Sequence, residues 1–159
     1  MSIESVKEYL EGWGLQDRVM EFIHSSATVA EAAEAIGCDE KEIAKTLSFM
    51  VEGAPVIIVM AGDAKIDNGK YKGIFHTKAV MLKFEEVEPL LGHPVGGVCP
   101  FALPSGIPVY LDESLRRFET VYPAAGTPNS AVKLSIEEIY RASGAKDWID
   151  ACKGWYGEE

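Results

Sequence analysis

Two apolar runs separated by a turn lie at residues 47–60, which read LSFMVEGAPVIIVM. Leu47 to Val51 and Val56 to Met60 are apolar and compatible with β-strands, whereas the intervening EGAP contains the Gly and Pro that favour a turn. This pattern predicts a β-hairpin, and with it at least one antiparallel strand pair.

Helical patterns dominate the sequence before this hairpin, and strand patterns dominate the sequence after it. Apolar spacing and capping residues predict helices at 2–11, 15–23, 29–36, 40–44, 68–72 and 85–91, and one that begins after Ser135. Further strands are expected at 80–82, 107–111, 119–122 and 131–134. This order predicts an α+β fold with a mixed or largely antiparallel sheet, rather than a regular alternation of parallel βα units.

Length and composition indicate one globular domain over residues 1–159. The chain is 47% hydrophobic and carries a formal net charge of −10, so it can bury one substantial core. The amino terminus lacks a basic region followed by an apolar run, and no segment is long and apolar enough to span a bilayer. We therefore expect a cytoplasmic protein without a membrane partner.

The cysteines and histidines show no metal-ligand spacing. They are Cys38, Cys99 and Cys152, and His24, His76 and His93. An odd number of widely spaced cysteines favours reduced thiols over a disulfide framework, and no histidine pairs with them at zinc spacing. We expect neither a metal site nor a cofactor.

Positive charge is concentrated in one segment of this acidic chain. Residues 61–83 carry five lysines and two aspartates, so the segment is +3 and the remainder −13. An acidic chain is a poor general nucleic-acid binder, which argues against DNA as a partner. The segment is either a solvated face or a phosphate-contacting patch, for which the candidates are Lys65, Lys70, Lys72 and Lys78.

A loop rich in Gly and Pro lies at residues 92–104, which read GHPVGGVCPFALP. Gly permits positive φ and Pro removes backbone donors, so no regular element is expected there. The loop is either a connector or a shaped wall whose free N–H groups face a ligand. Lys45, just before the hairpin, is likewise either a strand-edge lysine or a fixed cation for a carbonyl or phosphate.

Several motifs, taken in the order in which they occur along the chain, resemble those of the YbaK/EbsC-like family. This family contains free-standing relatives of the editing insertion of bacterial prolyl-tRNA synthetase. The motifs are AKTLSF at 44–49, AGDAKID at 61–67, GGVCP at 96–100, VYLD at 109–112 and GTPNS at 126–130. The resemblance runs from about Val19 to Ile139. It implies a curved sheet flanked by helices and hydrolysis of wrongly charged aminoacyl-tRNA, typically proline tRNA carrying a small non-cognate amino acid. The implied partners are mischarged tRNA and prolyl-tRNA synthetase.

The resemblance also assigns roles to individual residues. Lys45 matches the family's lysine, which lies against the loop and the acceptor end, while Gly96 and Pro100 match the ends of its Gly-x-x-x-Pro motif. Backbone N–H groups of Gly97, Val98 or Cys99 are suited to stabilise the oxyanion of ester hydrolysis. No Ser-His-Asp order is present, so a water activated by a ribose hydroxyl or a substrate group is expected instead of a protein nucleophile.

The amino-acid pocket is harder to assign from these motifs. The resemblance places its wall at residues 22–28 and its polar end at Asn129-Ser130, so the candidates are Phe22, Ser26, Thr46, Asn129 and Ser130. For the Phe22 side chain alone, a place on the core face of an amphipathic helix is the favoured alternative. Relatives that act on alanyl-tRNA carry a histidine just before the Asn-Ser/Thr element, whereas this chain has AAGTP at 124–128.

Two other functions remain compatible with the sequence. One is a noncatalytic module that binds an acceptor end or a synthetase, which an acidic surface suits. The other is a thiol enzyme that uses Cys99 with His93, six residues apart in the loop.

Overall fold

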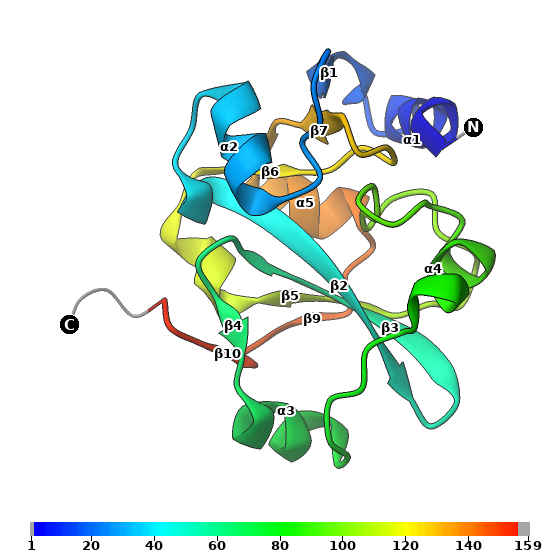
Figure 1. The fold of residues 1–159 in the computed structure, drawn as a ribbon, viewed down its shortest axis with the longest axis vertical. Helices are drawn as coiled ribbons and strands as arrows, with labels where there is room; N and C mark the ends of the chain where they lie inside the picture. Colours follow the sequence, from blue (N-terminus) through cyan, green and yellow to red (C-terminus); the bar gives the residue numbers. More distant parts are fainter. Residues whose placement is uncertain (1, 156–159) are drawn as a thin grey trace.

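A six-stranded sheet in the order β8-β6-β2-β3-β5-β9 forms the centre of the computed structural model, which describes residues 2–155 (Figure 1). Its strands are β2 (Ile43–Val51), β3 (Ala54–Ala61), β5 (Val109–Asp112), β6 (Thr120–Pro123), β8 (Leu134–Ser135) and β9 (Asp147–Ile149). The predicted hairpin is confirmed, because β2 and β3 pair antiparallel from Ala44–Ala61 to Val51–Ala54. Glu52 and Gly53 both have positive φ, 51° and 82°, as a tight turn between twisted strands requires.

The sheet is mixed, as predicted. Two short sheets accompany it: β1 (Val19–Glu21) with β7 (Ser130–Val132), and β4 (Lys65–Ile66) with β10 (Cys152–Lys153). Pairings β2–β3, β6–β8, β1–β7 and β4–β10 are antiparallel, whereas β2–β6, β3–β5 and β5–β9 are parallel. The α+β class is therefore confirmed.

The described residues form five α-helices around the sheet: α1 (Ser2–Glu11), α2 (Val29–Ile36), α3 (Asn68–Phe75), α4 (Phe84–Leu91) and α5 (Ile136–Ala142). The capping box of α2 is formed by Thr28 and Glu31, and that helix ends at Gly37 with φ 85°. Figure 1 shows α2 on one side of β2 and α3 on the opposite side. None of the helices within residues 2–155 combines the length and apolarity that crossing a membrane requires.

One hydrophobic core joins the amino-terminal helix to the end of the described chain. It contains Val6 and Leu10 of α1 together with Cys152 of β10. All five residues from Ile57 to Ala61 on β3 are fully buried, because both faces of this central strand are covered.

Two predicted helices are wrong in ways that affect the site. Residues 15–23 form a 3₁₀ turn, η1 (Gln16–Arg18), followed by β1, because β7 offers a backbone partner that outweighs the helical spacing. Residues 40–44 form only η2 (Glu40–Glu42), and β2 already begins at Ile43. Lys45 therefore lies within a strand rather than before one.

The remaining differences concern short strands. The strand expected at 80–82 is reduced to a single bridge between Met81 and Phe49. The one at 131–134 is divided between β7 and β8, whereas β4, β9 and β10 were not predicted. Strands of two or three residues carry too little pattern to be recognised, and their partners lie far away in the sequence.

Candidate functional site

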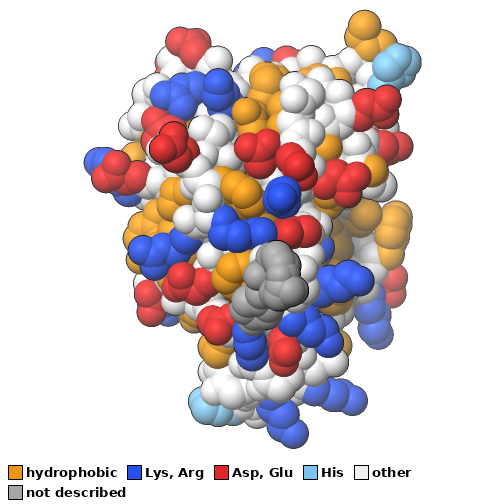
Figure 2. All heavy atoms as spheres, turned by 90° about the vertical axis from the view of Figure 1, so that its left-hand side faces the viewer, with side chains coloured by type: hydrophobic (Ala, Val, Ile, Leu, Met, Phe, Trp, Pro, Cys, Tyr) orange, Lys and Arg blue, Asp and Glu red, His pale blue; other side chains and the backbone are white. Residues whose placement is uncertain are grey.

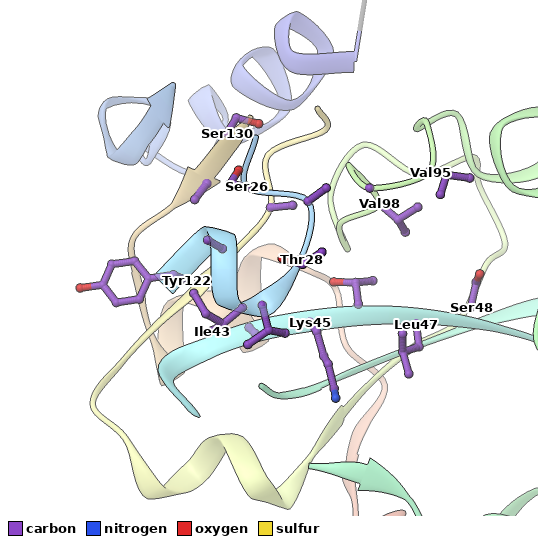
Figure 3. A pocket seen from close by; sticks show the side chains of 18 of the residues that line it. Ser26, Thr28, Ile43, Lys45, Leu47, Ser48, Val95, Val98, Tyr122 and Ser130 are labelled. Atoms are coloured by element: carbon purple, nitrogen blue, oxygen red, sulfur yellow. The ribbon is translucent and has the colours of Figure 1, made fainter. Parts of the chain in front are cut away.

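A cavity of about 340 Å³ opens at the edge of β2. Its walls come from the segment before α2, from β2, from residues 95–98 and from the end of β6 (Figure 3). The residues that line it are Ser26, Ala27, Thr28, Val29, Ala32, Ile43, Ala44, Lys45, Thr46, Leu47, Ser48, Met81, Val95, Gly96, Val98, Tyr122, Ala124, Ser130 and Ala131. This described lining holds one charged side chain, Lys45, and no carboxylate, imidazole or thiol.

The cavity exists because β2 is unpaired over part of one edge. Strand β6 pairs with β2 only at Ile43 and Ala44, and residues 80–82 contact it further on, where the Leu82 N–H donates to the Ser48 carbonyl. Backbone groups of alternate residues point to the same edge of a strand, so the N–H and C=O of Thr46 face the cavity. The Thr46 hydroxyl oxygen is buried and has no hydrogen-bond partner among the described residues.

A second wall is formed by residues 22–26 and 128–130, two segments that hydrogen bonds hold together. The Ser26 N–H donates to the Pro128 carbonyl at 2.6 Å, and the Asn129 side-chain amide donates to the Phe22 carbonyl at 2.9 Å. Ser130, whose hydroxyl lies 2.7 Å from that of Thr127, completes this wall. Of the predicted pocket residues, Ser26, Thr46 and Ser130 line the cavity, whereas Phe22 and Asn129 lie outside it and hold the wall in place.

The third wall is the loop at 92–104, which the two glycines allow to lie close to its neighbours. Gly96 has φ 90°, and a Cβ at Gly97 would lie 2.7 Å from the backbone of Thr127. Neither Gly96 nor Val98, both in the lining, has its N–H bonded to another described residue, so both donors are available. The Gly97 N–H is unavailable because it already donates to the Pro94 carbonyl at 2.9 Å. Gly97 therefore provides close packing instead of a donor.

The His93 side chain links the two ends of this loop by a hydrogen bond. Its Nε2 lies 2.7 Å from the Phe101 carbonyl, eight residues further on, and its ring is fully buried. The Nδ1 atom has no partner among the described residues. Because a carbonyl only accepts, Nε2 carries the proton, and the neutral ring ties the two ends of the loop together.

Cys99 and Pro100 belong to the loop but are buried and do not line the cavity. The Cys99 thiol is fully buried, 3.6 Å from Nε2 of His93, and burial raises its pKa to about 12. A nucleophilic cysteine requires a thiolate, which this environment disfavours. The geometry therefore contradicts the thiol-enzyme hypothesis.

Lys45 occupies a different place from the one expected. Figure 3 shows its side chain leaving β2 on the side away from Ser26, Val98 and Ser130. Its ammonium donates to the Gly62 carbonyl at 3.5 Å, the long end of the hydrogen-bond range. Burial lowers its pKa. The nearby Asp63 is bound by Arg117 at 2.6 Å, and Lys45 forms no ion pair with any described residue.

The lysines proposed to contact tRNA lie at the α3 end of the molecule. Figure 2 shows that Lys and Arg side chains gather at this lower end, while acidic side chains prevail above it. Lys65, Lys72 and Lys78 are exposed, whereas Lys70 is held by Asp150 at 3.0 Å. Lys70 is therefore partly neutralised.

The buried ring of His93 predicts a pH dependence of stability. Burial lowers its pKa below the usual value near 6.5, so the unfolded chain binds a proton at a higher pH than the folded chain does. We expect the free energy of unfolding to fall as pH drops below about 6.5, and the decline to be smaller in His93→Gln. Denaturant titrations at pH 5.5 and 7.5 measure this, with the exposed His24→Gln as control. Equal pH dependence in all three proteins would contradict the prediction.

An α+β fold with a small cavity, free backbone donors and a lysine defines a domain suited to stabilise negative charge on a small ligand. The family model for the aminoacyl-tRNA editing domain matches residues 24–142, and the chain belongs to this family.

Individual relatives agree with this assignment. The chain is 52% identical to the uncharacterised protein YwhH of Bacillus subtilis (strain 168), over 98% of this chain and 99% of that one. It is 30% identical to the proline–tRNA ligase of Aquifex aeolicus (strain VF5), over 72% of this chain but only 21% of the ligase. A crystal structure of a candidate trans-editing enzyme for prolyl-tRNA synthetase superposes with a TM-score of 0.87 and 31% identity, covering 96% of this chain and 98% of that one.

Several lining residues were not predicted from the sequence. Ser48 shares a face of β2 with Thr46, and strand alternation would have identified it had the strand been recognised from Ile43. Met81 and Val95 come from separate segments and carry no local signal, because only the folded chain brings them to the cavity.

Proposed function

We propose that this chain is a trans-acting deacylase that hydrolyses the ester of mischarged aminoacyl-tRNA, with the whole chain acting as one editing domain. The observation that carries the proposal is the cavity wall, which has two free backbone N–H groups and a single charged side chain. The family membership and the similarity to the candidate trans-editing enzyme support the same function.

In the proposed reaction the protein supplies neither a nucleophile nor a general base. Water adds to the ester carbonyl, the bond to the ribose oxygen breaks, and the amino acid and the free tRNA hydroxyl are released. The N–H groups of Gly96 and Val98 stabilise the oxyanion, and the proton of the water passes to the departing ribose oxygen through the neighbouring ribose hydroxyl or the substrate's own amino group. In this proposal the Lys45 ammonium leaves its long bond to Gly62 and turns towards the developing negative charge.

The polar groups of the cavity favour a small amino acid. Ser26, Thr46 and Ser130 offer hydroxyl groups to a space of about 340 Å³ whose other lining residues are mostly apolar. The unpaired Thr46 oxygen gives such a ligand a hydrogen bond that the free protein lacks. We propose proline tRNA carrying a small non-cognate amino acid as the substrate, in keeping with the similarity to proline–tRNA ligases.

The charge distribution bears on how tRNA is captured. The exposed Lys65, Lys72 and Lys78 provide a local phosphate contact on a chain of net charge −10. We propose that this contact is weak and salt-sensitive, and that prolyl-tRNA synthetase in the cytoplasm delivers the mischarged tRNA.

A panel of proline tRNAs charged with alanine, cysteine, serine or proline tests the function. We expect release of at least one small non-cognate amino acid and sparing of proline, measured by the loss of acid-precipitable labelled aminoacyl-tRNA. The same tRNAs without protein give the spontaneous rate. Binding of tRNA or synthetase without any release would contradict the proposal and favour a noncatalytic binding module.

A further inference from the structure

An apolar shelf lies beside the mouth of the cavity, and no packing within the described chain explains it. It consists of Met81, Phe84 and Val95, whose exposed fractions are 51%, 76% and 45%. Phe84 is the first residue of α4, whose buried residues are Val87 and Leu91 instead. An aromatic ring exposed to this degree is a candidate contact for a ligand.

The shelf is continuous with the cavity. Met81 and Val95 line the cavity itself, and Val95 also lines a neighbouring hollow together with Phe84 and Pro94. Its position is set by β2, because the Met50 N–H donates to the Val80 carbonyl at 2.8 Å. A ligand that fills the cavity and extends past Val95 therefore reaches the ring of Phe84.

We infer that this shelf binds the nucleobase of the terminal nucleotide of the substrate, an inference that rests on the proposed function. The aminoacyl group of such a substrate is joined through one ribose to a base, so a base must lie close to the mouth when the amino acid is in the cavity. The flat face of Phe84 suits base stacking, which tolerates any base because every base has a π-face.

The charges around the hollow distinguish a base from a phosphate. Glu85 and Glu88 line the hollow beside Phe84. Their carboxylates would repel a phosphate, but they are acceptors for the exocyclic amino group of a base, as carboxylates are in nucleic-acid grooves. The surface therefore fits an amino-bearing base such as adenine, while the phosphates of the substrate lie elsewhere.

Paired substrates test this inference. One substrate is the mischarged tRNA that the wild type hydrolyses, and the other is the same amino acid esterified to ribose without a base. We expect Phe84→Ala to raise KM for the tRNA about tenfold with kcat retained, and to leave KM for the ribose ester unchanged. Phe84→Trp should retain the wild-type KM. Trp13→Ala, at an aromatic residue that is 46% exposed and lines neither the cavity nor the hollow, is the matched control.

A binding measurement keeps the inference separate from the catalytic proposal. In the full chain carrying Phe84→Trp, we expect adenosine 5′-monophosphate to quench fluorescence beyond any change in the wild type, and ribose 5-phosphate to leave it unchanged. Such quenching supports the base site even if no ester is hydrolysed. Absence of quenching together with an unchanged KM in Phe84→Ala overturns it. An effect of Phe84→Ala confined to synthetase binding also overturns it, in favour of a protein-docking surface.

Discussion

Lys45→Ala is expected to lower kcat for deacylation about a hundredfold, the effect typical of removing one group that stabilises an oxyanion. Lys45 is the one charged side chain of the described cavity lining, and no carboxylate, imidazole or thiol there can take over its role. Because burial lowers its pKa and no ion pair with a described residue holds it, the ammonium is free to move towards a better partner than the Gly62 carbonyl. Single-turnover hydrolysis of mischarged tRNA measures the effect.

Three controls separate charge from packing in this experiment. Lys45→Met keeps much of the side-chain volume but not the charge, so it should be as slow as Lys45→Ala and at least as stable as wild type, because a partly buried charge is removed. Lys45→Arg should recover part of the rate. Lys41→Ala removes an exposed lysine outside both the cavity lining and the proposed tRNA contact, and should leave kcat unchanged. A Lys45→Met variant as fast as wild type would show that the ammonium has no catalytic role.

Gly97→Ala is expected to reduce both stability and activity. The new methyl group would lie 2.7 Å from the Thr127 backbone and 2.8 Å from that of Gly126, and backbone atoms cannot swing aside as a side chain can. Overpacking of this kind costs about 1–3 kcal/mol of the free energy of unfolding. The displaced loop would also move the N–H groups of Gly96 and Val98, so kcat should fall in the molecules that remain folded.

The matched control is Gly73→Ala. Gly73 lies within α3, and a Cβ there meets nothing within 4 Å, so this variant should be as stable as wild type or slightly more so. Denaturant titration and kcat, measured on all three proteins at the same temperature, make the comparison. Wild-type stability and kcat in Gly97→Ala would show that the loop does not depend on this close contact.

The elements predicted correctly are those whose signals are local. Thr28 with Glu31 and Ser135 with Glu138 form the capping boxes that the spacing predicts, because a cap depends on residues three positions apart. The turn at Glu52-Gly53 was also predicted correctly, because it too depends on residues that are adjacent in the sequence. Residues 15–23 were predicted incorrectly because their apolar spacing is also compatible with a short strand, and the choice depends on β7, more than a hundred residues away.

The site could be predicted only in part, for the same physical reason. Composition identified the loop at 92–104, and the resemblance selected Ser26, Thr46 and Ser130, which the fold brings together. Sequence could not distinguish Gly96, whose N–H bonds to no other described residue, from Gly97, whose N–H is bound to the Pro94 carbonyl and which permits close packing against Thr127. Nor could it show that Asn129 bonds to the Phe22 carbonyl outside the cavity.

The α+β class, the central hairpin and the existence of a shaped loop follow from residue types and short-range patterns in this chain. The side of β2 on which the Lys45 ammonium lies, the burial of Cys99 and the apolar shelf at Phe84 follow from the folded structure alone. Strand pairing and burial arise from contacts between segments distant in sequence, and those contacts determine which residues of the loop line the cavity.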